Sequence, residues 1–297
     1  MAAGPCVRSS RRRRSSAVAL CAAAVGLAAV LPAAAPHEQG HGPAQGVTVL
    51  RIEDLRRVPR HRLPTIRTYR WAAAAALSVV EQDLRLPPLR GEIILYTDVA
   101  AFEAALVGEG HDPGVIASSL ATLVGVSTPG RIRLNAHHLY PYDWPDRIAA
   151  LAHEMTHVAQ YELAGGRRRD TEQWLREGMA EWVSLRVLEA LGQGTASAGV
   201  RATRAALAGD AGARALPSLG DLASTDSWCR RIAEGLERRV YDLSLVAAAD
   251  LIDRHGLGAL IGYFERASRS DDHDDHFRSC FGETREGFEA RVEACWR

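Results

Sequence analysis

The stretch LAHEMTHVAQYELAG, residues 151–165, places His153 and His157 four positions apart, with Glu154 directly after the first histidine. An α-helix brings residues i and i+4 to the same side, one turn apart, so both imidazoles would project together. Two neutral imidazoles at this spacing suit a divalent metal, usually zinc, and an adjacent carboxylate can take a proton from water on that metal. The alternative is a pair of histidines on the surface of an ordinary helix, because so short a pattern also arises by chance.

The residues around this pattern predict a long helix over about 145–164. Asp143 is a suitable N-cap, and Pro145 suits the first turn. An apolar stripe follows at helical spacing, and we expect it to face the core. The stripe consists of Ile148, Leu151, Ala152, Met155 and Ala159.

A third ligand would distinguish a catalytic metal site from a chance pattern, because catalytic zinc takes three protein ligands and keeps one position open. The segment EQWLREGMAEW, 172–182, predicts a second helix over about 172–191. If this helix packs antiparallel to the first, Glu177 can reach the metal. Glu181, one turn further on, can then hydrogen-bond the outer nitrogen of a ligand histidine and fix its orientation.

The second helix also carries residues with simpler expected roles. Gly178 and Ala180 are small enough to let another helix approach closely. Trp174 and Trp182 are expected in the core. The alternative for the acidic residues is a solvated charged face, on which Glu172 would be a bystander. Three other possible ligands have no partner at a coordinating spacing: His137, His138 and Asp170.

The rest of the chain predicts an α+β layout in which a strand-containing half, about 47–143, precedes a mostly helical half, about 144–297. Helices are expected at 65–86, 99–107, 145–164, 172–191, 197–208, 229–254, 256–268 and 284–296, and strands at 92–96, 124–126 and 131–134. Residues 194–220 are open to interpretation as a lid or as a linker. The acidic run 271–276 lacks the spacing of a calcium loop and is expected to be a solvated connection.

Residues 1–35 predict a secretory signal peptide, with a basic start, an apolar run at 17–31 and small residues at 33–35. The apolar run is shorter than the roughly 20 residues of a spanning helix, so an uncleaved membrane anchor is the weaker alternative. Residues 36–46 are Gly- and Pro-rich and predict a flexible linker. The expected location is therefore extracytoplasmic, either secreted or periplasmic, with no stable membrane span after cleavage.

Charge and cysteine content restrict the possible partners. After removal of residues 1–35 the chain has 31 basic and 36 acidic residues, a formal charge of −5, with no basic stripe interleaved with aromatic residues. Nucleic-acid binding is therefore not supported. An odd number of cysteines remains, Cys229, Cys280 and Cys295, and their pairing in an oxidising compartment stays open. The oligomeric state is not indicated.

The motifs HEMTH, 153–157, and WLREGMAEW, 174–182, together resemble the gluzincin zinc metallopeptidases, in particular the M1-like and peptidase MA-like catalytic domains. The resemblance covers about 91–297 and implies a thermolysin-like zincin fold, for which we expect a domain over 47–297. It also implies Zn²⁺ held by His153, His157 and Glu177, with Glu154 as the general base.

Weaker parts of the resemblance extend to three other segments. Residues 239–256 resemble a helix that often carries a tyrosine facing the site, which makes Tyr241 the candidate for oxyanion stabilisation. The alternative is a tyrosine that only packs the core. Residues 125–135 resemble a substrate-side edge strand, and we expect 131–135 to pair with an extended substrate. Residues 277–296 resemble a closing pair of helices.

These observations lead to the hypothesis of an exported, zinc-dependent metallopeptidase that acts on peptides or proteins. No G-x-M-E-N signature is present, so an aminopeptidase specificity is not implied. The alternative is a zinc-stabilised binding or scaffolding module of the same fold without turnover. Glu154 argues against that alternative, because a purely structural metal site has no use for a base. Neither the substrate nor endo- versus exo-cleavage can be predicted.

Overall fold

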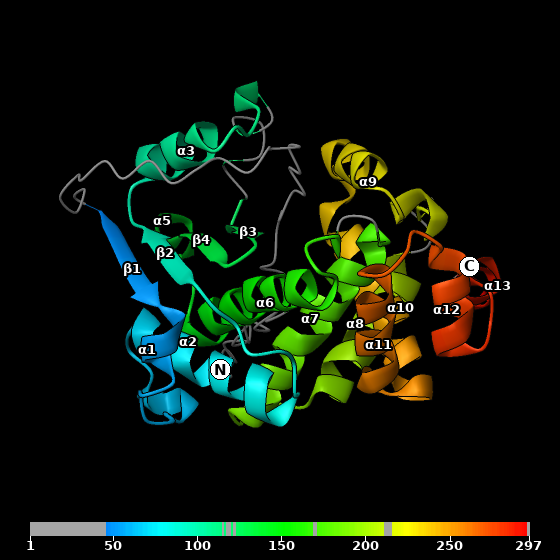
Figure 1. Ribbon diagram of the computed structural model, residues 1–297, viewed down its shortest axis with the longest axis horizontal. Helices are drawn as coiled ribbons and strands as arrows, with labels where there is room; N and C mark the ends of the chain where they lie inside the picture. Colours follow the sequence, from blue (N-terminus) through cyan, green and yellow to red (C-terminus); the bar gives the residue numbers. More distant parts are fainter. Residues whose placement is uncertain are drawn as a thin grey trace, which may run out of the picture.

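The computed structural model describes residues 46–114, 116, 120, 123–168, 171–210 and 216–295. The fold is mixed α/β, with a small four-stranded sheet in the first part and a helical second part (Figure 1). This order agrees with the predicted strand-containing half followed by a helical half. The predicted leader, 1–35, and residues 36–45 of the predicted linker lie outside the described residues.

The elements have the following bounds. The strands are β1 (Val47–Arg51), β2 (Glu92–Tyr96), β3 (Gly125–Thr128) and β4 (Arg131–Asn135). The helices around them are α1 (Ile52–Leu55), α2 (Tyr69–Ser78), α3 (Val99–Gly108) and α5 (Ala136–Leu139), and a π-helical turn, Val79–Asp83, continues α2. The helical half contains α6 (Trp144–Leu163), α7 (Gln173–Ala190), α8 (Ala196–Asp210), α9 (Thr225–Arg231), α10 (Glu237–His255), α11 (Leu257–Ala267), α12 (His273–Phe281) and α13 (Arg285–Glu293).

The strand order is β1-β2-β4-β3, which makes β3 an edge strand and β4 an internal one. β2 and β4 pair in parallel, whereas β1 with β2 and β3 with β4 pair antiparallel. The prediction that 131–135 is the edge strand is therefore wrong. Strand β2 pairs with one side of β4. The hairpin turn at 129–130 connects β3 to β4, so β3 pairs with the other side of β4 and lies at the edge of the sheet. Gly130 adopts the positive φ of 69° that this tight turn requires.

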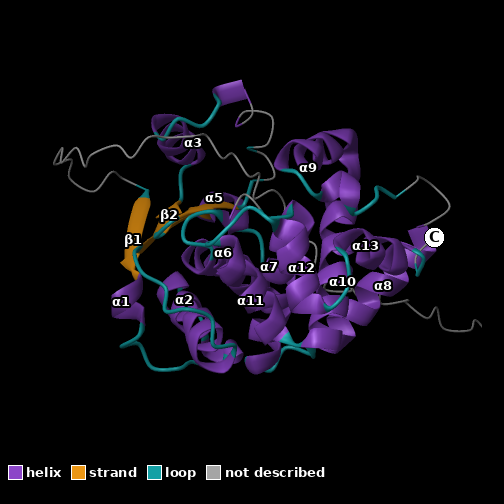
Figure 2. Ribbon diagram, turned by 45° about the vertical axis from the view of Figure 1, so that its right-hand side comes forward, coloured by secondary structure: helices purple, strands orange, loops and turns teal. Residues whose placement is uncertain are grey.

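Both faces of the sheet are covered. Ile93, Ile132 and Leu134 belong to the main core, together with the buried residues of α2 and α6. Tyr96 and Val126 belong to a second apolar cluster with residues of α3. Figure 2 shows α3 on one side of the sheet and α6 on the other. The sheet thus provides a wall along α6, the helix with the two motif histidines.

Helix α6 forms as predicted from its local signals. Asp143 is the N-cap, and its side chain accepts a hydrogen bond from the main-chain N–H of Asp146 at 3.2 Å. Pro145 occupies the first turn. All five residues of the predicted apolar stripe, Ile148, Leu151, Ala152, Met155 and Ala159, are buried. The stripe therefore anchors α6 in the core and sets the direction in which its histidines project.

Helix α7 lies between α6 and α10 (Figure 1). A Cβ atom added at Gly178 would lie only 2.1 Å from the main-chain oxygen of Ser244 on α10, so the two helices can approach this closely only at a glycine. On the α6 side, Ser184 Oγ donates a hydrogen bond to the main-chain oxygen of Ala149 at 2.9 Å. The expectation that Gly178 admits another helix is confirmed, and that helix is α10.

Several elements differ from their predictions. Strand β1 was not predicted, although the run VTVL at 47–50 is rich in β-branched residues. The predicted helix 229–254 is two helices, because Gly235 between α9 and α10 has a φ of 79°, outside helical values. The acidic run 271–276 is not a loop throughout. Asp272 caps α12 and accepts a hydrogen bond from the main-chain N–H of Asp275 at 3.0 Å, so the run begins a helix.

The predicted core residues and cysteines have distinct outcomes. Trp174 is fully buried as expected, whereas Trp182 is only half-buried. Cys229, Cys280 and Cys295 are free thiols, with no disulfide among them.

Residues 196–210 of the segment interpreted as a lid or linker form α8. None of the helices within the described ranges combines the length and apolar character that crossing a membrane would require.

Candidate metal centre

Helices α6 and α7 bring His153, His157 and Glu177 together in the interior. His153 Nε2 lies 3.0 Å from His157 Nε2, and Glu177 Oε2 lies 3.2 Å from the first of these nitrogens and 3.4 Å from the second. Each of the three residues is about 1% exposed. They form a group that could hold a metal ion, and its members are the three ligands that the sequence predicts.

The outer nitrogens of both imidazoles face oxygen atoms. His153 Nδ1 lies 3.1 Å from Glu181 Oε1, the partner that the sequence predicts for a ligand histidine. His157 Nδ1 lies 3.1 Å from Gln160 Oε1, and the amide nitrogen of Gln160 donates to the main-chain oxygen of Arg176 at 2.9 Å. A carboxylate only accepts, and Gln160 turns its oxygen toward the ring. We therefore assign the proton of each histidine to Nδ1.

This tautomer assignment leaves three acceptor atoms facing one another. The Nε2 atoms of His153 and His157 and Oε2 of Glu177 all point lone pairs into the same small space, at separations of 3.0 to 3.4 Å. Ligands about 2.0–2.1 Å from a tetrahedral zinc ion are separated by about 3.3 Å, close to these separations. Two imidazole nitrogens and one carboxylate oxygen also form a donor set typical of catalytic zinc, so the residues fit the metal.

Burial affects the two kinds of ligand differently. The largest effect on His157 is its burial, which lowers the pKa of the imidazole and favours the neutral form that a metal needs. Burial alone would raise the pKa of Glu177. The neighbouring His157 and His153 lower it by a larger amount, so the pKa of this carboxyl lies well below its usual range. Burial thus favours a neutral His157, while Glu177 remains a carboxylate anion.

Glu154 lies on the side of α6 that faces β3. It is 3% exposed, and Ser127 Oγ donates a hydrogen bond to Glu154 Oε2 at 2.6 Å. A Cβ atom added at Gly125 would lie 3.0 Å from Glu154 Oε1, so this glycine leaves room for the carboxylate. Side chains at i and i+2 of a strand point to the same face, which explains why 125 and 127 both meet Glu154.

Tyr241 lies on α10 beside the imidazole pair. The centres of the Tyr241 and His153 rings are 6.2 Å apart, and the tyrosine is 5% exposed. The ring of Trp228, from α9, packs edge-on against Tyr241 at 5.1 Å. The tyrosine that the resemblance implies is thus a neighbour of the candidate ligands as well as a core residue.

Other predicted candidates lie away from the three ligands. His137 and His138 are on α5, exposed and half-buried respectively. Glu172 is a bystander, as expected, but it is buried rather than solvated, and Tyr263 Oη donates to it at 2.5 Å. Asp170 lies outside the described residues.

Sequence reasoning missed four polar residues that contact the candidate ligands or the base, or orient those that do: Ser127, Gln160, Gln173 and Arg176. The only available signal was positional. Gln160 follows His157 by three residues and Gln173 precedes Glu177 by four, spacings that place each pair on one side of a helix.

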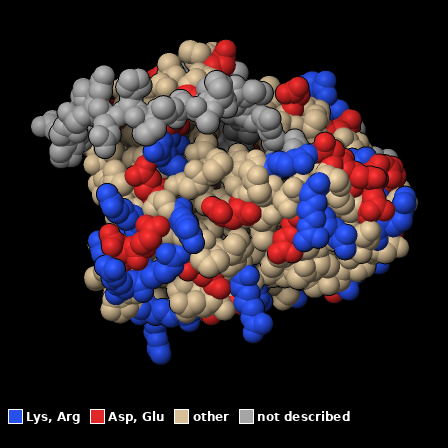
Figure 3. All heavy atoms as spheres, in the orientation of Figure 1, with Lys and Arg blue, Asp and Glu red and all other residues tan. Residues whose placement is uncertain are grey.

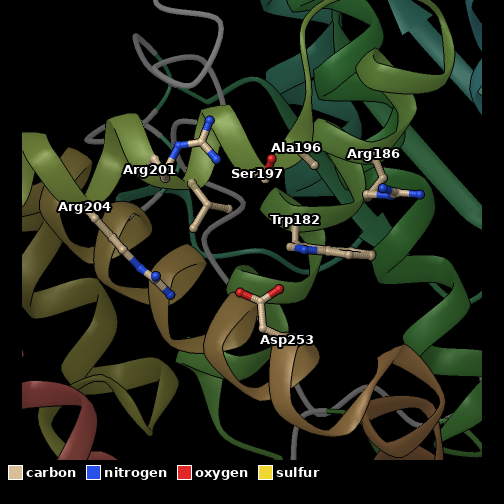
Figure 4. Close-up of a pocket in the computed structure, with 8 residues that line it drawn as sticks. Trp182, Arg186, Ala196, Ser197, Arg201, Arg204 and Asp253 are labelled. Carbon is tan, nitrogen blue, oxygen red and sulfur yellow. The ribbon is translucent and has the colours of Figure 1, made fainter.

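The cavity nearest to the second half of α7 has a different chemistry from the candidate metal centre. A cavity of about 320 Å³ between α7, α8 and α10 is lined by Trp182, Asp253 and several arginines (Figure 4). None of the three candidate ligands lines this cavity. Figure 3 shows acidic and basic side chains intermingled over the face that it draws. Among the described residues, His153, His157 and Glu177 are the group suited to a metal.

Comparison of the chain with protein-family models, with curated proteins and with solved structures gave no match.

Proposed function

We infer that this chain is a zinc-dependent metallopeptidase of the gluzincin type, with His153, His157 and Glu177 as the metal ligands. The observation that carries this proposal is the convergence of the Nε2 atoms of His153 and His157 and of Glu177 Oε2 at 3.0 to 3.4 Å in the interior. Burying such a set is costly unless a cation lies among the lone pairs. The leader-like residues 1–35 support export of the enzyme.

Zinc bound by these residues would supply a Lewis acid that polarises the scissile carbonyl and lowers the pKa of a water molecule. The protein contributes three ligands, which leaves one coordination position for water or substrate. Glu181 and Gln160 hold the rings of His153 and His157 through their Nδ1 atoms. The imidazoles then present Nε2 without a reorientation at the moment of reaction.

Glu154 is the group that takes the proton from the attacking water and passes it to the leaving amine. The hydrogen bond from Ser127 Oγ occupies one oxygen of this carboxylate, Oε2. The other oxygen, Oε1, is the one nearest to Gly125, where no side chain blocks it. Ser127 thus fixes the rotamer of the base while one oxygen stays available for the proton.

Tyr241 supplies a phenol on the α10 side of the site. Its ring lies next to that of His153, and contacts with Trp228 restrict its orientation. A hydrogen bond from this phenol to the carbonyl oxygen of the substrate would strengthen as negative charge develops there. We assign Tyr241 the role of stabilising the oxyanion.

The edge strand β3 offers a backbone for an extended substrate. The main-chain N–H of Asn135 donates to the oxygen of Val124 at 2.9 Å, and bonded and non-bonded pairs alternate along an antiparallel ladder. Val126 therefore bonds to β4, whereas the main-chain groups of Gly125 and Ser127 face the open edge. A peptide that pairs with this edge would run beside Glu154. We therefore assign the pairing with substrate to 125–128 instead of 131–135.

The proposal is tested with the full chain. Metal content is measured on protein purified without added metal, and hydrolysis is measured on a diverse peptide library with and without a chelator. We expect about one zinc per chain and chelator-sensitive cleavage. Glu154→Gln should keep the zinc and lose hydrolysis, whereas the same change at Glu162, exposed on the same helix, should alter neither.

The possible outcomes separate the functional alternatives. Zinc binding without cleavage of any peptide would favour a binding or scaffolding module of this fold. Absence of metal together with absence of cleavage would exclude both readings of the site. Full activity of Glu154→Gln would remove Glu154 as the base.

A further inference from the structure

Arg176 is a buried arginine directly before the candidate ligand Glu177, with 2% of its surface exposed. Its guanidinium donates hydrogen bonds to the segment that leads into α7. The acceptors there are the main-chain oxygens of Arg168, at 3.1 Å, and Thr171, and the side-chain oxygen of Gln173. All three acceptors are neutral, so the contacts fix geometry rather than form an ion pair.

The contact with Arg176 determines which way the Gln173 amide is turned. A guanidinium can only donate, so the oxygen of the amide must face Arg176. Thr225 Oγ1, from α9, donates to the same oxygen at 3.1 Å. The nitrogen of the amide therefore faces the opposite way, and it donates to Glu177 Oε1 at 2.6 Å. Gln173 is 1% exposed, so water does not compete for these bonds.

This hydrogen bond separates the two oxygens of Glu177 by function. Oε1 accepts from Gln173, while Oε2 is the oxygen 3.2 Å from His153 Nε2 and 3.4 Å from His157 Nε2. A carboxylate held in this way presents one oxygen to a metal and keeps the other away from it. Binding through both oxygens would require the loss of a buried hydrogen bond.

The main chain of Arg176 orients a second amide. Its carbonyl oxygen accepts from Gln160 Nε2 at 2.9 Å, which turns Gln160 Oε1 toward His157 Nδ1 at 3.1 Å. The proton of His157 is thereby held on Nδ1, and Nε2 keeps its lone pair. One residue thus fixes, through two glutamines, the donor atom of two of the three candidate ligands.

We propose that Arg176, Gln173 and Gln160 form an orienting clamp that makes Glu177 a one-oxygen ligand and makes His157 bind through Nε2. These are positioning residues, because none of them supplies a ligand atom. The inference rests on the proposed function and deepens it by specifying the coordination mode. A one-oxygen Glu177 leaves the fourth position for water or substrate, whereas a two-oxygen Glu177 would take it.

The test uses the full chain, with zinc and cobalt(II) as probes. Zinc affinity is measured by competition with a chromophoric chelator, and the visible absorption of the cobalt(II) form reports coordination number, because four-coordinate cobalt absorbs more strongly than five-coordinate cobalt. In Gln173→Ala we expect zinc binding about 10- to 100-fold weaker. We also expect a weaker cobalt band, since Glu177 Oε1 becomes free to bind. Gln193→Ala, at an exposed glutamine after α7, is the matched control and should match the parent protein.

The outcomes distinguish the clamp from the proposed function. A Gln173→Ala protein with the zinc affinity and cobalt spectrum of the parent overturns the clamp, even if its melting temperature is lower, because a merely structural role would affect stability alone. Gln173→Met keeps the length of the side chain without the amide, and it gives the same readouts if the alanine variant does not fold. If the parent protein itself binds no zinc, the proposed function fails and the clamp fails with it.

Discussion

Ser127 Oγ lies 2.6 Å from Glu154 Oε2, which joins the edge strand β3 to the helix that carries the candidate ligands. Both residues are buried, so the hydrogen bond is shielded from water. It connects the strand that is expected to bind the substrate with Glu154, the residue that is expected to accept the proton of the attacking water. A contact of this kind sets the position of Glu154 relative to a substrate, not merely its distance from the metal.

Replacing Ser127 with alanine should therefore reduce turnover without removing the metal. We expect kcat to fall about 10-fold, because Glu154 would sample rotamers that do not reach the water, and small misplacements of a catalytic group are costly. Zinc content should stay at the parent level. Ser197→Ala, at an exposed serine of α8, serves as the control. An unchanged kcat in Ser127→Ala would show that the helix alone positions Glu154.

Removal of the metal should lower the stability of the protein. A ligand that binds only the folded state stabilises it by about 4 kcal/mol at 1,000 times its Kd. We expect a chelator to lower the melting temperature and added zinc to restore it. Glu177→Ala should make the melting temperature insensitive to both, whereas Glu162→Ala should respond like the parent. A parent protein whose melting temperature ignores chelator and zinc would contradict the metal site.

The parts of the site that follow from helix periodicity could be predicted from the sequence. The i, i+4 spacing put His153 and His157 on one side of α6, and Asp143 and the apolar stripe fixed where that helix begins and which side is buried. Glu177 and Glu181 were found in the same way, on a second helix of the same kind. In each case the relevant geometry lies within one helix, so local spacing determines it.

The parts that depend on contacts between elements could not be predicted. The sequence predicted 131–135 as the edge strand, whereas the edge strand is 125–128. The difference depends on the side of β4 with which β2 pairs, and no local sequence pattern contains that information. The partners Ser127 and Glu154 are 27 residues apart. Gln173 could be placed near Glu177 by its spacing, but the direction of its amide depends on Arg176 and Thr225. Such polar partners become visible only once the helices are packed.

Gly178→Ala should be strongly destabilising, because the added Cβ would meet the main-chain oxygen of Ser244 at 2.1 Å. Relief of this overlap requires α7 and α10 to move apart, which we expect to cost about 3 kcal/mol or more. The control is Gly262→Ala on α11, where no atom lies within 4 Å of the added Cβ. That substitution should be neutral or stabilise by up to about 1 kcal/mol, since alanine is the better helix former. Chemical denaturation of both variants measures the difference, and equal stabilities would mean that the α7–α10 contact tolerates a side chain.

Glu289 should make the stability of the fold depend on pH. The pKa of this carboxyl is raised from 4.5 to about 7, mainly by burial. Arg285 and the hydrogen bond that Trp174 Nε1 donates to Glu289 Oε1 at 3.2 Å both lower the pKa, whereas the neighbouring carboxylates Glu172 and Glu293 raise it.

Between pH 4.5 and about 7 the folded protein therefore keeps a proton on Glu289 that the unfolded chain has lost. The free energy of unfolding should fall over this range, by about 2 kcal/mol, since the contribution is complete below the unfolded pKa and lost above the folded one. Glu289→Gln preserves an acceptor for Trp174 and should make this fall smaller than in the parent, whereas Glu265→Gln, at an exposed position of α11, should not. Denaturation curves at a series of pH values measure the effect, and a Glu289→Gln profile with the same slope as the parent from pH 5 to 7 would show that Glu289 ionises normally in the folded protein.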